Sequence, residues 1–146
     1  MWANEYTAVT RLSQETVWAA LRALHEGTLT YPGADRFVLH GPFAVGTTVS
    51  VTPAGQDTFD SRIVDLVEPV TYADETSFGD VTLLFRHTLE AVPEGTRVTH
   101  RLEITGSAAD EVGPALGPQI SGDFDESMAR LFQQAESLGA PAHTAT

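Results

Sequence analysis

Two histidines lie on the predicted apolar faces of neighbouring strands, and their side chains are the first candidates for chemistry. They occur in "LLFRHTLEAVPEGTRVTHRLEITG", residues 83–106, which is typical of two strands joined by a tight turn. Side chains alternate along a strand, so one face of the first strand carries Val81, Leu83, Phe85, His87 and Leu89. The matching face of the next strand carries Val98, His100, Leu102 and Ile104. Imidazoles titrate near neutrality, so this pair suits proton transfer.

The turn between the strands determines which side chains are opposite one another. A loop centred on residues 94–95 pairs Leu89 with His100 and His87 with Leu102. The two histidines are then diagonal neighbours, about 7–8 Å apart at the backbone and within side-chain reach.

The preceding strand adds Tyr72 and Asp74 to the same face. Continuing the count through the turn at 78–79 pairs Tyr72 with Phe85 and Asp74 with Leu83. Tyr72 is a candidate to polarise a carbonyl or anchor a ligand, and a plain role in the wall of the core competes with this. Asp74 fits a solvated rim as well as it fits a ligand site.

The inward histidines have a functional and a structural interpretation, and the sequence leaves both open. An unpartnered polar group buried among hydrocarbons costs about 1–3 kcal/mol, which indicates water or a polar ligand atom inside. Alternatively, each imidazole bonds a neighbouring backbone group or carboxylate and serves packing alone. We expect no metal site, because two diagonal histidines lack a third ligand, and we expect no cofactor.

Composition excludes several classes of function. The chain has 146 residues, enough for one domain. It contains no cysteine, and its eight basic residues are all arginine, which excludes thiol nucleophiles, disulfides and Schiff-base catalysis by lysine. A net charge of −12 disfavours binding to nucleic acids and anionic membranes. Neither a signal peptide nor a membrane span is apparent, so we expect a cytoplasmic protein.

The elements that position these residues are mostly strands. Alternating patterns predict strands at 4–12, 36–40, 47–53, 57–67, 70–77, 80–92 and 96–105. Their short connections require antiparallel hairpins. After the first strand, Ser13 is a typical N-cap, and an amphipathic helix follows that ends at Gly27.

The last element is a long helix. Apolar residues recur every three or four positions between Val112 and Leu138, while Pro114 and Pro118 are expected to kink it or divide it in two. We expect this helix to end at Gly139, so that one domain spans 1–139 and a flexible tail spans 140–146. The sheet and the helix each have one apolar face and must cover one another, which predicts an α+β architecture.

Five segments of the chain carry a resemblance to a known family: "LSQETVWAAL", "LHGPFAVGTTVSV", "SRIVDLVEP", "HTLEAVPEGTRVTHRLEITG" and "ALGPQISGDFDESMARLFQQAE". With these segments the chain resembles the SRPBCC superfamily, which has the helix-grip fold of START domains and the birch-pollen allergen. Within that superfamily, the resemblance is to the bacterial polyketide cyclase/dehydratase-like branch. It implies a curved antiparallel sheet of about six or seven strands wrapped around the C-terminal helix. "TLTYPGADR" replaces the usual tryptophan and proline after the first helix.

The resemblance implies a cavity between sheet and helix for apolar or aromatic small molecules, and it supplies no shared catalytic residue. The residues expected to line such a cavity are Asp74, Phe85, Leu89, Leu102, Phe124, Met128 and Phe132. Our first hypothesis is a protein that binds a small hydrophobic, polyketide-like ligand. The second is a cyclase or dehydratase in which His87 or His100 moves a proton and Tyr72 polarises a carbonyl. The third is a protein-interaction module, and a homodimer is left open.

Overall fold

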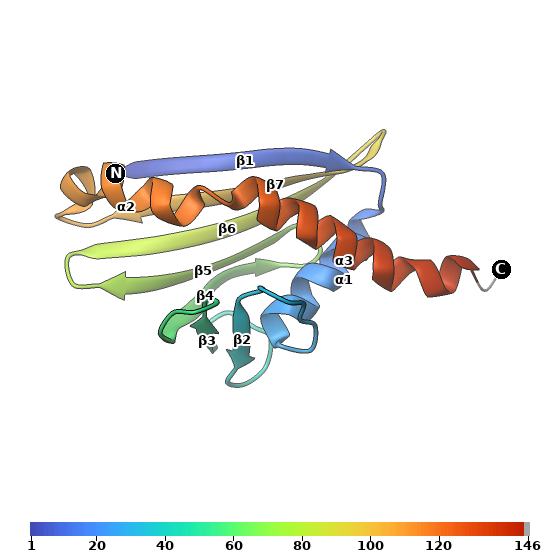
Figure 1. The fold of residues 1–146 in the computed structure, drawn as a ribbon, viewed down its shortest axis with the longest axis horizontal. Coiled ribbons are helices and arrows are strands. Elements are labelled where there is room, and N and C mark those ends of the chain that lie inside the picture. The colour runs from blue at the N-terminus through green and yellow to red at the C-terminus, as the bar shows by residue number, and fades with distance from the viewer. Residues whose placement is uncertain (145–146) are drawn as a thin grey trace.

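A computed structural model describes residues 1–144, and the side chains of residues 1–138. Seven antiparallel strands form one sheet in the order β1-β7-β6-β5-β4-β3-β2 (Figure 1). The strands are β1 (Trp2–Thr10), β2 (Arg36–Leu39), β3 (Thr48–Thr52), β4 (Phe59–Val67), β5 (Thr71–Phe78), β6 (Val81–Val92) and β7 (Gly95–Thr105). The helices are α1 (Gln14–Glu26), α2 (Ala109–Ser121) and α3 (Phe124–Thr144). The α+β helix-grip architecture predicted from the sequence is confirmed.

Helix α1 has the predicted ends. Ser13 has extended backbone angles, and its side chain accepts a hydrogen bond from the Thr16 amide. Glu15 lies in the first turn, where a negative charge complements the helix dipole. Gly27 ends the helix with a φ of 82°, and a Cβ there would collide with the carbonyl oxygen of Phe37. The end of α1 is therefore fixed against β2.

The long C-terminal helix is divided in two, as predicted, but the division does not fall at a proline. Pro114 and Pro118 lie inside α2, and the break comes at residues 122–123. The predicted end at Gly139 is wrong, because α3 extends to Thr144. The flexibility of the tail at 140–146 stays a prediction, and its last two residues lie outside the described part.

The helices cover one face of the sheet, which we call the inner face. Helix α2 packs against β1 and β7, and α3 packs against α1 and β1. Trp2 lies against Gly113 and Gly117, where any Cβ on α2 would collide with its ring. These two glycines let α2 approach β1 closely and so fix its position over the inner face.

The β6–β7 hairpin has a different register from the one predicted. Val92 pairs with Gly95, so the turn consists of residues 93–94, and His87 lies directly opposite His100. The predicted diagonal arrangement of the two histidines is therefore wrong, and they are closer neighbours than expected.

The chemistry of the turn explains this shift. Pro93 occupies the second turn position and Gly95 the fourth, which are the places these residues prefer in a type I turn. The predicted pairs Leu89–His100 and His87–Leu102 are wrong for this reason. In the structure Leu89 pairs with Val98, and Leu102 pairs with Phe85.

The β5–β6 hairpin is also shifted by two residues from the prediction. Tyr72 pairs with His87 rather than Phe85, and Asp74 pairs with Phe85 rather than Leu83. A shift of two residues keeps each side chain on the same face. Tyr72 and Asp74 therefore point inward, as predicted.

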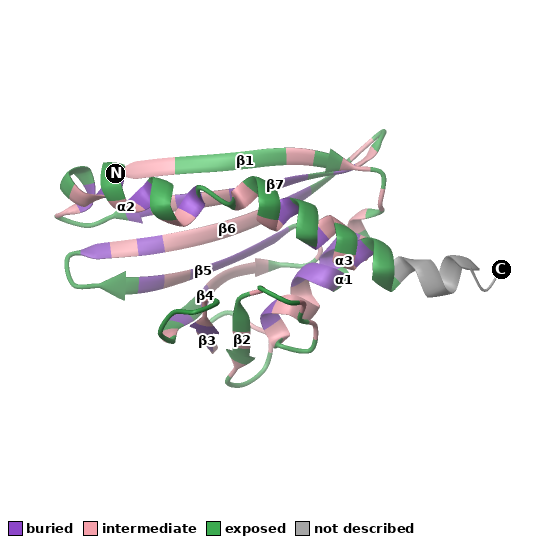
Figure 2. Cartoon of the chain, viewed as in Figure 1, coloured by how far each residue is buried: buried purple, intermediate pink, exposed green. Residues whose placement is uncertain are grey.

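Figure 2 shows buried residues on the strands of the sheet and on the helices that cover it. The buried apolar side chains form two clusters. The larger joins α1, the central strands and α3, and its fully buried members include Val17, Ile63, Tyr72, Leu89 and Met128. The smaller joins α2 to the first residues of β6 and the last residues of β7, and its buried members are Val81, Leu83, Leu102, Ile104 and Ala109. Among the described residues, no helix combines the length and the hydrophobicity that a membrane crossing requires.

Candidate functional site

A row of ring-bearing side chains crosses four neighbouring strands on the inner face. Direct pairing places Tyr6 opposite His100, His100 opposite His87, and His87 opposite Tyr72. Directly paired residues point to the same side of a sheet. The row brings together all three side chains predicted to be catalytic, namely His87, His100 and Tyr72.

The two paired histidines contact one another edge to face. Their ring centroids are 4.5 Å apart, and the ring planes are at 89°. Nδ1 of His87 and Nε2 of His100 are buried, and neither has a hydrogen-bond partner within the described chain. Native structures rarely leave such atoms unpaired without a water, an ion or a functional reason. The second interpretation from the sequence, in which each imidazole bonds a neighbouring protein group, is not supported for these two atoms.

Burial keeps both imidazoles neutral. Loss of hydration lowers the pKa of His100 to about 4. The same effect holds the pKa of His87 well below its ordinary value, and the nearby His100 and His25 lower it further. Each neutral ring has one nitrogen that donates a hydrogen bond and one that accepts.

A third histidine, His25, belongs to the cluster and was missed by the sequence analysis. It lies in the last turn of α1, where its Nδ1 donates to the Leu21 carbonyl at 2.8 Å. Its ring centroid is 4.2 Å from that of Tyr72 and 5.2 Å from that of His87. Burial lowers its pKa to about 4. The signal was its spacing of four residues from Leu21, and of eight from Val17, which puts it on the buried face of the helix.

Tyr72 and Asp74 form a buried hydrogen-bonded pair. The Tyr72 hydroxyl donates to Asp74 Oδ2 at 2.7 Å, and the Ser61 hydroxyl lies 3.4 Å from Oδ1. Asp74 is only 5% exposed, so the solvated rim considered for it is wrong. Burial raises the pKa of Asp74 to about 6, although the bonds from Tyr72 and Ser61 oppose that shift. Burial also raises the pKa of Tyr72, and the Asp74 charge adds to this.

The predicted lining residues divide into buried and half-buried groups. Leu89, Leu102 and Met128 are almost fully buried. Phe85, Phe124 and Phe132 keep part of their surface exposed. Phe124 of the smaller apolar cluster reaches His100, with ring centroids 6.0 Å apart. The histidine pair therefore lies where the two clusters meet.

An apolar hollow opens on the same face of the sheet, between α2 and the β5–β6 turn. It has a volume of about 720 Å³, and its apolar lining includes Phe78, Val81, Val112 and Leu116. Val112 and Leu116 pack on the smaller cluster, as do Phe85 and Phe124. Half-buried apolar side chains thus connect this hollow with the histidines.

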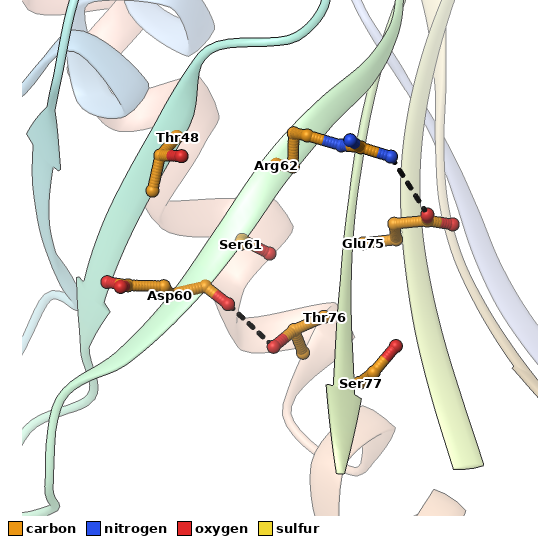
Figure 3. Close-up of a pocket in the computed structure, with 7 residues that line it drawn as sticks. All are labelled: Thr48, Asp60, Ser61, Arg62, Glu75, Thr76 and Ser77. Carbon is orange, nitrogen blue, oxygen red and sulfur yellow. Dashed lines mark hydrogen bonds and ion pairs between the residues drawn. The ribbon is translucent and has the colours of Figure 1, made fainter.

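A second, polar hollow of about 290 Å³ lies where β4 and β5 separate (Figure 3). Hydroxyl and charged side chains line it, and Thr76 donates to the backbone carbonyl of Asp60 across it. Ser61 belongs to its wall and also approaches Asp74. This hollow therefore lies beside the buried carboxylate.

Among residues 1–138, whose side chains the structure describes, no cluster of three or more His, Asp or Glu side chains is placed to hold a metal ion. His40, an exposed histidine directly after β2, forms a hydrogen bond with Ser50 through Nε2 at 2.7 Å and is not part of the buried cluster.

Comparison with known proteins identifies the fold. No protein-family model matches the chain, and no curated protein does so either. SA2116 from Staphylococcus aureus superposes with a TM-score of 0.69 at 9% identity, over 94% of this chain and 95% of that one. Ara h 8.0201 superposes with a TM-score of 0.62 at 17% identity, over 93% and 95%. Norcoclaurine synthase from Thalictrum flavum superposes with a TM-score of 0.63 at 11% identity, over 90% of this chain and 86% of that one. The helix-grip fold implied by the resemblance to the SRPBCC superfamily is therefore confirmed.

Proposed function

Because the chain has the helix-grip fold, we propose that it binds a small hydrophobic or aromatic molecule between the inner face of the sheet and the C-terminal helices. The observation that supports the proposal is the pair of unpartnered nitrogens, His87 Nδ1 and His100 Nε2, at the junction of two apolar clusters. Ligand sites are typically apolar with a few polar groups that orient the ligand. The hollow beside α2 is the proposed entrance, because Val112 and Leu116 of its lining pack on the same apolar cluster as Phe124, whose ring centroid lies 6.0 Å from that of His100.

We expect the neutral dye Nile red and 2-naphthol to bind. At 100 times the dissociation constant, 2-naphthol should raise the unfolding temperature by about 5–10 °C. Ala115→Phe, which narrows the entrance, should weaken binding by about 10-fold, because relieving a steric clash costs 1–3 kcal/mol. Ala129→Phe is the matched control, since Ala129 is also helical and exposed but lies outside the hollow. Absence of binding by both compounds in a thermal shift and fluorescence titration would refute the proposal.

A second candidate function is acid–base catalysis, such as that of a cyclase or dehydratase. It is favoured by Asp74, a buried carboxylate whose pKa is raised to about 6 and which holds the Tyr72 hydroxyl. A carboxylate tuned in this way is an effective base near neutral pH. Norcoclaurine synthase, which shares the fold, is by its name a synthase. His87 and His100 stay candidates for moving the proton.

Elimination of 5-nitrobenzisoxazole, which needs only a base in an apolar site, measures this activity without a known substrate. The rate should rise with pH through about 6, because only the ionised Asp74 accepts a proton. Asp74→Asn should lower the rate by about 100-fold, with Asp60→Asn on the outer face as the control. An unchanged rate in Asp74→Asn, in protein that still binds 2-naphthol, would exclude Asp74 as the base.

A further inference from the structure

We propose that the inner site selects uncharged ligands that carry a hydroxyl group, and that this hydroxyl bonds the unpartnered nitrogens of His87 and His100. A carboxylate of the same shape is rejected. This inference rests on the proposed function and adds to it the chemical class of the ligand.

A hydroxyl group matches what the two imidazoles lack. His87 Nδ1 and His100 Nε2 are both buried, and their rings are in edge-to-face contact at 4.5 Å. A neutral imidazole nitrogen either donates or accepts a hydrogen bond, depending on the tautomer, and a hydroxyl does both. An alcohol or phenol therefore satisfies either nitrogen in either tautomer. An apolar ligand without a hydroxyl leaves both atoms unpaired.

Among the residues whose side chains are described, no lysine or arginine is available to neutralise an anionic ligand inside. The chain has no lysine. The arginines in ion pairs with carboxylates are Arg22, Arg62, Arg86, Arg97 and Arg101. The remaining ones, Arg11, Arg36 and Arg130, are exposed. Burying a carboxylate without a counter-charge is strongly unfavourable, so the interior disfavours anions.

The surroundings of the site add negative charge. Asp80 and Glu111 line the apolar hollow, and Asp74 faces inward in the row next to the histidines. The net charge of −12 acts in the same direction over longer distances. An amine is attracted by these groups, but the Asp74 carboxylate already accepts a hydrogen bond from Tyr72 and lies close to Ser61. We therefore expect the hydroxyl compound to bind more tightly than the amine.

Four ligands of one shape test this order: 2-naphthol, 2-naphthoate, 2-(aminomethyl)naphthalene and naphthalene, titrated at pH 7.5 by calorimetry or fluorescence. We expect 2-naphthol to bind at least about 10-fold more tightly than 2-naphthoate. Its advantage over naphthalene should be about 10-fold and should fall in His87→Leu and His100→Leu, because each variant removes one hydrogen-bonding nitrogen. The control His40→Leu removes an exposed histidine and should keep the full ratio.

Each other outcome contradicts the inference in a distinct way. Equal or tighter binding of 2-naphthoate overturns the exclusion of anions, and tightest binding of the amine assigns the anchor to Asp74. An unchanged ratio of 2-naphthol to naphthalene affinity in both histidine variants removes the role of the imidazoles. In all these cases naphthalene still binds and the proposed function stands. If neither naphthalene nor 2-naphthol binds, the proposed function fails as well.

Discussion

Acidification from pH 7 to pH 4 is expected to lower the free energy of unfolding by at least about 3 kcal/mol. The reason is the cluster of His25, His87 and His100, whose imidazoles are neutral in the fold and take up protons readily in the unfolded chain. In the fold, burial lowers the pKa of His25 and His100 to about 4 and that of His87 well below its ordinary value. At pH values between the folded and the unfolded pKa of these histidines, the unfolded state binds more protons than the folded state. The free energy of unfolding therefore decreases as the pH decreases.

The pH window follows from these shifts. An unfolded histidine titrates near 6.5, so the stabilisation is complete above that pH and is lost as pH falls towards 4. Each of His25 and His100 accounts for roughly 3 kcal/mol. Asp74 acts in the opposite sense, because its pKa of about 6 is raised above the unfolded value; it offsets roughly 3 kcal/mol as pH falls from 6 to 4. A net loss of about 3 kcal/mol remains, because His25 and His100 together outweigh Asp74, and His87 adds to the loss.

Urea unfolding at pH 7, 6, 5 and 4 measures this dependence. In His100→Leu, the decrease in the free energy of unfolding between pH 7 and pH 4 should be smaller by roughly 3 kcal/mol. At pH 7 the stability of this variant should be near that of the wild type, because the unpaired nitrogen is removed. His40→Leu, at an exposed position, should keep the wild-type dependence. The same change of stability with pH in all three proteins would show that the buried imidazoles do not control it.

Substitution of Gly95 by alanine is expected to destabilise the fold by about 3 kcal/mol or more. Gly95 begins β7 with a φ of 142°, a backbone conformation that residues with a side chain rarely adopt. A Cβ there would collide with the backbone carbonyl oxygen of Thr10 and lie 2.8 Å from the Cα of Arg11. Both obstacles are backbone atoms, so relief requires the strands to move.

The comparison variant is Gly55→Ala. Gly55 also has a positive φ, of 74°, but nothing lies within 4 Å of its added Cβ. We therefore expect a loss of about 1–2 kcal/mol from backbone strain alone. Urea unfolding of both variants at pH 7 separates the two contributions. Similar losses at both positions would mean that the contact between Gly95 and Thr10 does not hold the hairpin in place.

Local patterns predicted the elements well because their causes are local. The Ser13 cap and the left-handed Gly27 follow from side-chain and backbone preferences within one turn. The end of the last helix was predicted on the same basis, at Gly139, and was wrong, since α3 passes through that residue. A glycine permits a helix to end without requiring it.

The faces of the strands were predicted correctly, while their partners were not. Both hairpins were predicted two residues out of register, and a shift of two leaves each side chain on its face. This is why His87, His100 and Tyr72 point inward as expected, and why the direct contact between the two histidines was not foreseen. Pro93 decides the register of the β6–β7 hairpin, because proline prefers the second position of a turn.

The amino-acid sequence by itself determined the α+β class, the inward orientation of the two histidines, and the absence of lysine and cysteine chemistry, because alternation, capping and composition can be read one residue at a time. Only the tertiary structure brought His25 from α1 to Tyr72, and Ser61 to within 3.4 Å of Asp74. It also left His87 Nδ1 and His100 Nε2 without a hydrogen-bond partner among the described residues. Contacts and unpaired buried atoms of this kind depend on how separate elements pack and on the register between strands, and no local pattern encodes either.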